Sequence, residues 1–186
     1  GRSAAASVVY KRQTFSWKRG LAFVAFSAMF AVVVPSTSAQ GQLGMAVISG
    51  TVRIDGQVAT GSVPVGAVSR ISTSKDSTVT LRLAKGGEIK ITGQADMAIT
   101  PGATGPHIQL ICGEISVTST VPATVVAQGG GRVEPEIGKA TITRSGKSTT
   151  VKKGKSKDFD DADTVTVPTS DSVVIVKSKA NCHCNC

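Results

Sequence analysis

A cysteine cluster at the C-terminus is the part of the sequence with the clearest capacity for chemistry. It reads Cys182-His183-Cys184-Asn185-Cys186, with three thiols and one imidazole among five residues. Thiolates and imidazole nitrogens are ligands of soft metals, so Zn²⁺ or Cu⁺ is one candidate occupant. Alternate residues of an extended tail point in the same direction, which would place the three cysteines on one side. The one-residue spacers are, however, shorter than the spacers usual in structural zinc sites.

The same cysteines have a second interpretation as disulfide or crosslinking groups, and we favour it. A fourth cysteine, Cys112, lies in an aliphatic run, where we expect a small buried side chain. Four cysteines allow three complete pairings, and a pairing between residues i and i+2 would be strained. Three possibilities therefore stay open, which are a disulfide to Cys112, crosslinks between chains through the tail, and a metal site at Cys182, His183, Cys184 and Cys186.

Two adjacent charge runs form the next candidate. Lysines dominate residues 152–157, and aspartates dominate residues 158–163. Clustered carboxylates are ligands for Ca²⁺, but the glycine-centred loop with a closing glutamate is missing. We expect a solvated turn in which the aspartates pair with the lysines before them. The lysines could contact anionic lipid or glycan, although a solvated edge strand explains them without a partner.

Neither catalysis nor nucleic-acid binding is indicated. The chain has two histidines, His107 and His183, and neither belongs to a catalytic motif. We therefore predict no enzyme and no cofactor. Five of the 21 basic residues precede residue 40, so residues 40–186 carry 16 basic and 12 acidic residues, a net charge of +4. Phe159 is the only aromatic residue in that part, which leaves no platform for stacking bases.

The first 39 residues have the layout of a secretory signal peptide. Lys11, Arg12, Lys18 and Arg19 precede the apolar run Leu21–Val34, which small residues follow as far as Ala39. The run is shorter than the ~20 residues that span a bilayer. We expect an N-terminal hydrophobic helix that is cleaved after Ala39, with retention as a membrane anchor as the alternative. Membrane contact would then occur only through residues 21–34.

Residues 40–179 read as a single all-β domain, which residues 180–186 follow as a cysteine-rich tail. The stretch Thr78–Ile91 alternates aliphatic and polar residues on either side of Gly86-Gly87, the pattern of a β-hairpin with one buried face. A glycine followed by two alternating β-branched residues recurs at Gly50, Gly87 and Gly113. Turn signals at short intervals predict about twelve short strands, arranged as an antiparallel roll or sandwich or a β-solenoid.

This pattern resembles the extracytoplasmic FecR-like domain. The resemblance covers residues 46–157 and rests on the segment from Gly50, the Thr78–Ile91 hairpin, Leu110–Val117 and the strand pair in 141–154. It implies a bacterial protein that is exported to the periplasm or cell surface. Regulators of this family also carry a cytoplasmic anti-sigma portion, and only about 20 residues precede the apolar run here.

From these observations we expect a non-enzymatic module for protein interaction or scaffolding, with a protein partner in the cell envelope. One alternative is a membrane-anchored sensor or accessory subunit of an envelope complex. Another is a metal- or redox-handling protein that acts through Cys182, Cys184 and Cys186.

Overall fold

A computed structural model of the protein describes residues 41–169 and 172–183. These residues form an all-β domain, as the alternating pattern predicts, and its fifteen strands join in one sheet. In chain order the strands are β1 (Gly44–Ile54), β2 (Gln57–Val65), β3 (Ser69–Thr73), β4 (Thr78–Leu83), β5 (Gly87–Thr92), β6 (Ala95–Pro101), β7 (Pro106–Cys112), β8 (Glu114–Ser119), β9 (Ala123–Ala127), β10 (Gly131–Ile137), β11 (Lys139–Arg144), β12 (Lys147–Lys152), β13 (Lys157–Phe159), β14 (Thr164–Val167) and β15 (Val173–Ser178). The expected N-terminal helix and the cleavage position at Ala39 lie outside the described residues.

The strand count exceeds the expected number of about twelve for two reasons. The long pattern that includes Leu110–Val117 divides at Gly113 into two strands, β7 and β8. A short strand, β13, also forms where the lysine run meets the aspartate run, a place where we had expected only a solvated turn. Within the described residues, no helix has the length and hydropathy needed to cross a bilayer.

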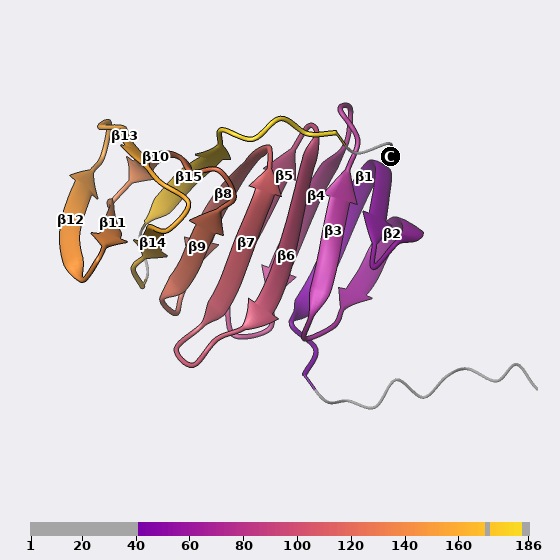
Figure 1. Cartoon of the computed structure of the whole chain (residues 1–186). Helices are drawn as coiled ribbons and strands as arrows, with labels where there is room; N and C mark the ends of the chain where they lie inside the picture. Colours follow the sequence, from indigo (N-terminus) through magenta and orange to yellow (C-terminus); the bar gives the residue numbers. More distant parts are fainter. Residues whose placement is uncertain (1–40, 170–171, 184–186) are drawn as a thin grey trace, which may run out of the picture. The chain divides into compact units, whose positions relative to one another are not determined.

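The sheet folds over at β1 into two facing layers and is nearly closed, like a barrel. Its order is β12-β11-β14-β9-β7-β6-β3, then β1, then β4-β5-β8-β15-β10-β13. The first half of β1 pairs with β4 and the second half with β3, so β1 belongs to both layers. In Figure 1, β3, β6 and β7 lie in front, and β4 and β5 run behind them. The far ends also meet, because the Gly154 N–H donates to the Pro135 carbonyl at 3.0 Å.

Two glycines with positive φ stand where the chain leaves one layer for the other. Gly50 (φ 94°) lies in the register shift that divides β1, and Gly113 (φ 93°) separates β7 from β8. A Cβ on Gly113 would lie 2.5 Å from the Gln94 carbonyl oxygen, closer than real Cβ atoms approach. Both the backbone angle and the close approach therefore require glycine. Two of the three recurring glycines thus mark corners in the chain path, and the third, Gly87, begins β5 after the hairpin turn.

The predicted hairpin is confirmed as β4 and β5. Leu81 faces Ile89 across the pair, and Val79 faces Ile91. All four side chains are fully buried, because alternation sends the aliphatic set inward. They form part of the single aliphatic core between the two layers.

Phe159 contributes the largest fully buried side chain of the described residues. It lies in β13, opposite Gly131 of β10. A Cβ on Gly131 would lie 2.7 Å from Phe159 Cζ, so the glycine makes room for the ring. Burial of this one aromatic ring explains why a strand forms inside a charged stretch.

Candidate functional site

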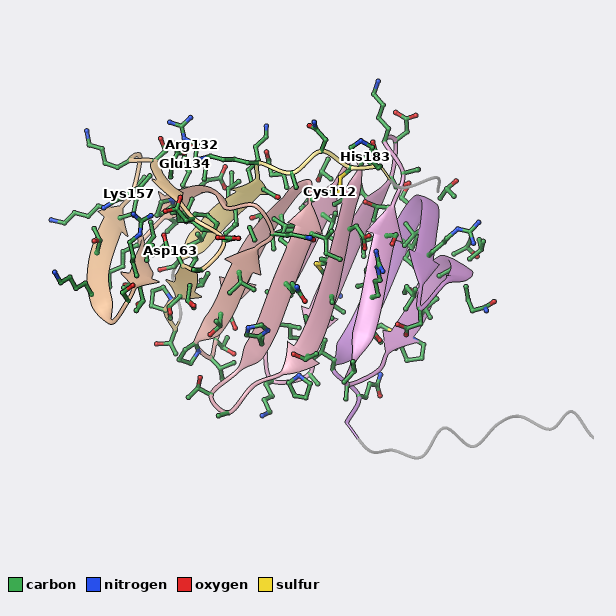
Figure 2. The ribbon with its side chains drawn as sticks, in the orientation of Figure 1. Cys112, Arg132, Glu134, Lys157, Asp163 and His183 are labelled. Carbon is green, nitrogen blue, oxygen red and sulfur yellow. A yellow bond between two sulfur atoms is a disulfide. The ribbon has the colours of Figure 1, made fainter. Side chains whose placement is uncertain are left out.

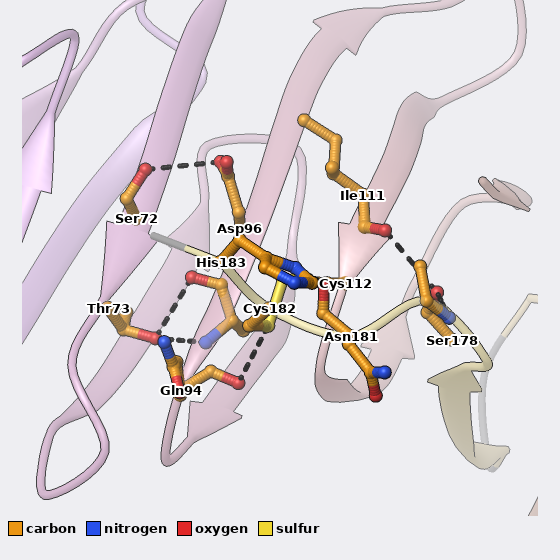
Figure 3. Close-up of a disulfide and its surroundings, with 12 residues drawn as sticks. Ser72, Thr73, Gln94, Asp96, Ile111, Cys112, Ser178, Asn181, Cys182 and His183 are labelled. Atoms are coloured by element: carbon orange, nitrogen blue, oxygen red, sulfur yellow. Dashed lines mark hydrogen bonds between the residues drawn. A yellow bond between two sulfur atoms is a disulfide. The ribbon is translucent and has the colours of Figure 1, made fainter. Parts of the chain in front are cut away.

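The cysteine tail is joined to the sheet by a disulfide between Cys112 and Cys182. The two Cα atoms are 5.2 Å apart, and the residues are 70 positions apart in sequence. Figure 3 shows the tail crossing the end of the sheet, with Cys112 at the end of β7. The expectation that Cys112 is buried is confirmed, and of the pairings left open by the sequence the structure contains the one between Cys112 and the tail.

Backbone and hydroxyl hydrogen bonds hold the tail before it reaches the disulfide. The Ser178 N–H donates to the Gly113 carbonyl at 2.9 Å, and the Lys179 N–H donates to the Gly130 carbonyl at 3.1 Å. The Ser178 hydroxyl donates to the Gln128 carbonyl at 3.2 Å and accepts from the Ala180 N–H at 3.0 Å. These bonds place the chain so that Cys182 meets Cys112.

The surroundings of the disulfide are polar. Cys182 Sγ lies 3.6 Å from the Gln94 carbonyl oxygen, a contact rather than a hydrogen bond, since a disulfide sulfur carries no hydrogen. His183 is exposed, and its Nδ1 lies 3.0 Å from the Asn181 carbonyl oxygen. Nearby, the hydroxyl of Thr73 donates to the Gly93 carbonyl at 2.6 Å.

An ion pair borders the same region. The side chain of Asp96 is 7% exposed and pairs with Arg70, whose Nε donates to Oδ1 at 2.9 Å and whose Nη2 contacts Oδ2. The Ser72 hydroxyl also donates to Asp96 Oδ1, at 3.1 Å. A carboxylate that accepts these bonds is satisfied by its neighbours. It therefore forms part of the wall of this region.

The structure describes two of the four proposed metal ligands, Cys182 and His183. Cys182 is bonded to Cys112, so in this state its sulfur is not a thiolate. Cys184 and Cys186 lie outside the described residues. Among residues 41–169 and 172–183, no group of three or more histidine, cysteine, aspartate or glutamate side chains is placed to hold a metal ion. The metal site at Cys182, His183, Cys184 and Cys186 stays a prediction, and it would require Cys182 in its reduced form.

In the described part of the chain, the ion pairs of the aspartate run are with two arginines and with Lys179, whereas Lys157 acts on Asp163 through its charge only. This corrects our expectation that the lysines before the run are its partners. Asp163 is 2% exposed, and Arg144 of β11 donates to it through Nε at 3.0 Å and through Nη2 at 2.7 Å. Arg144 also contacts Asp160 at 2.7 Å. The pairs of Asp158 are with Arg132, at 3.9 Å, and with Lys179, at 3.6 Å.

Arg144 shifts the pKa of the buried Asp163 carboxyl. The hydrogen bond from Arg144 lowers the pKa of Asp163, burial opposes that shift, and the Asp160 N–H reinforces it. The hydrogen bond to Asp163, with the charges of Asp160 and Asp163, raises the pKa of Arg144. In Figure 2 Asp163 and Lys157 lie well away from Cys112 and His183. The cluster of Arg144, Asp160 and Asp163 joins the end of β11 to the turn before β14, which is a structural role.

An apolar pocket, the end pocket, opens at the end of the sheet where the described chain begins. It has a volume of about 220 Å³, and its walls include Leu43, Leu83, Pro106 and Val121, with Lys85 also lining it. Sequence reasoning did not find it, because its walls come from segments that are far apart in the chain and carry no motif.

Ordered backbone shapes this end pocket. The Leu43 N–H donates to the Val65 carbonyl at 2.9 Å, and the Leu43 carbonyl accepts from the Ala84 N–H at 2.8 Å. On the opposite wall, a Cβ on Gly105 would lie 2.1 Å from the Pro122 carbonyl oxygen. The wall formed by residues 101–106 can therefore pack against Pro122 only because Gly105 has no side chain.

Comparison with protein-family models, with curated proteins and with solved structures finds no match at the thresholds used.

Proposed function

We propose that this protein is an exported, non-enzymatic β-domain that binds a protein partner in the periplasm or at the cell surface of a bacterium. The end pocket is the observation that carries this proposal. Apolar pockets with few polar groups are the usual places where proteins receive a ligand or an anchoring side chain. At about 220 Å³ the end pocket is smaller than the 300–1,000 Å³ typical of cofactor sites. Its size suits one or two aliphatic side chains of a partner.

Two further features support an exported interaction module. A disulfide such as Cys112–Cys182 is stable in oxidising compartments and rare in the cytosol. We also infer that the folded-over sheet is a FecR-like roll, in which the chain alternates between layers as it does in a β-solenoid. The FecR-like resemblance remains part of the proposal.

A binding experiment with a small probe tests the end pocket directly. N-acetyl-leucinamide, titrated into the protein with labelled methyl groups, should shift the resonances of Leu43, Leu83 and Val121. The methyl groups of Ile142, which belongs to β11, should not move. Equal shifts throughout the protein, or none at the end pocket, would contradict the proposal.

A native pull-down with mass spectrometry then identifies the partner, and a purified partner tests the contact. Val121→Asp places a charge in the wall of the end pocket, where Val121 is only partly buried. We expect this variant to weaken partner binding at least tenfold, which is about 1.4 kcal/mol. Val126→Asp is the matched control, because Val126 is a partly buried valine of β9 that does not line the end pocket. Equal loss in both variants would count against the end pocket as the binding site.

A further inference from the structure

Strand β2 forms one margin of the sheet and pairs with β1 alone among the described strands. Figure 1 shows it at the right edge, beyond β1 and β3. The free side of an edge strand presents unpaired N–H and C=O groups to any chain that can add to it. Alternate residues of β2 turn these groups outward.

The ladder identifies them. Thr51 and Asp55 of β1 bond to β3, because the Thr51 carbonyl accepts from the Ser74 N–H and the Asp55 N–H donates to the Arg70 carbonyl. Backbone groups of successive strand residues point to opposite sides, so Val52 and Ile54 turn toward β2. Their partners are Ala59 and Gln57. Val58 therefore directs its N–H and C=O groups away from β1, and Thr60 and Ser62 follow on the same side. The register shift of the β1–β2 pair falls opposite Thr60, and Gly61, with φ 71°, bends β2 at this point.

This outward run has no protection by charge. Strand β2 contains no lysine, arginine, aspartate or glutamate, and Val58 is 63% exposed. Pro64, which has no N–H, ends the run. Strand β12, in contrast, begins at Lys147 and ends at Lys152, so two copies joined antiparallel along it would oppose like charges.

We propose that β2 is a self-association edge, at which two copies of the chain join antiparallel about a two-fold axis at Thr60. In this register Thr60 faces Thr60 of the second copy, Val58 faces Ser62, and Pro64 lies beyond the bonded stretch. The outward N–H of Val58 then meets the Ser62 carbonyl of the other copy, and the bend at Gly61 lies at equivalent places in both strands. A two-fold contact of this kind closes after two subunits.

The side chains agree with this register. Arg53 lies beside Val58 on β1, and Val47 lies beside Ser62. Across the joined edge, neighbouring side chains on one face of the sheet follow in the order Arg53 and Val58 of one copy, then Ser62 and Val47 of the other. No like charges meet in this row. Because two edge strands bury less than the ~800 Å² per partner of a standard interface, the dimer should depend on concentration.

A cysteine crosslink tests the register. In a background with Cys184→Ser and Cys186→Ser, Thr60→Cys should give a covalent dimer on mild oxidation. Facing bonded residues have Cα atoms ~5.5 Å apart, within the range that a disulfide bridges. Val58→Cys is the control, because in this register the two copies of residue 58 lie four positions, about 13 Å, apart along the strands. Crosslinking at 58 as strong as at 60, or none at 60, would overturn the proposal.

Association in solution provides a second readout. Sedimentation equilibrium of residues 40–186 should show a monomer–dimer equilibrium. Thr60→Lys places like charges face to face and should weaken it about tenfold. Thr150→Lys, which changes another exposed threonine, on β12, should leave it unaltered. A monomer at every concentration, or a dimer indifferent to Thr60→Lys, would refute the edge contact. Neither outcome bears on the end pocket, because no residue of β2 lines it.

Discussion

Removal of the Cys112–Cys182 disulfide should destabilise the domain strongly. The bond joins residues 70 positions apart. In the chain-entropy description, closing a loop of that length restricts the unfolded chain by about 4 kcal/mol at 25 °C. The loop includes every strand from β8 to β15, so most of the second half of the domain is affected. We expect Cys182→Ala to lower the free energy of unfolding by about 3–4 kcal/mol.

Urea unfolding of residues 40–186 provides the measurement. The signal should be far-UV circular dichroism, because Trp17 precedes this part of the chain and Phe159 is its only aromatic residue. The variant should also show a steeper dependence on urea, since an unlinked unfolded chain exposes more surface. Cys112→Ala should cost about 1 kcal/mol more than Cys182→Ala, because Cys112 is buried and leaves a void.

The control variant replaces Cys184 and Cys186 with alanine and keeps the disulfide. We expect its stability to equal that of the parent protein. Treatment of the parent protein with a reductant should reproduce the effect of Cys182→Ala. If Cys182→Ala changed the free energy of unfolding by less than 1 kcal/mol, the loop-closure reasoning would be wrong for this domain.

Three further predictions concern the rest of the fold. Gly113→Ala should lower the free energy of unfolding by about 3 kcal/mol, and Gly146→Ala should lower it by about 1 kcal/mol. Both glycines have positive φ, but only Gly113 is also crowded by its neighbours. Equal losses of the two variants in urea unfolding would argue against the effect of crowding. Phe159→Ala should cost about 3–5 kcal/mol, since it empties the space of the largest buried side chain, and a loss below 1 would mean that β13 contributes little. The lowered pKa of Asp163 gives stability that is present above its unfolded pKa near 3.9 and is lost as pH falls through the lower folded value. The stability difference between the parent protein and Arg144→Met should therefore shrink as pH falls from about 5 to 2, and a constant difference would show that Arg144 acts through packing alone.

Local patterns predicted the parts of the fold that depend on neighbours in sequence. Alternation identified the hairpin of β4 and β5, because the side chains of a strand turn to opposite faces whatever lies beyond them. The recurring glycine positions were likewise visible, and Gly50 and Gly113 indeed adopt positive φ. The same reasoning predicted the all-β class, which the described residues confirm. That the protein is no enzyme and binds no nucleic acid stays a prediction.

Other features depend on contacts between distant segments, and sequence reasoning missed them. Strand β13 forms because β10, far earlier in the chain, offers Gly131 opposite Phe159. Asp163 is buried because Arg144 reaches it from β11, whereas a local reading pairs aspartates with the lysines next to them. The end pocket has no motif at all, since its walls are assembled from several loops.

The cysteine tail shows the same division most plainly. The sequence by itself determined that the tail holds three closely spaced cysteines, that a fourth cysteine lies in a strand, and that three pairings were possible. Only the tertiary structure decided that Cys112 and Cys182 meet. Their meeting requires β15 to end beside β7, held by the bond from the Ser178 N–H to the Gly113 carbonyl. Residue type sets which bonds are chemically possible, but a bond of fixed length forms only where the folded sheet brings its two atoms together.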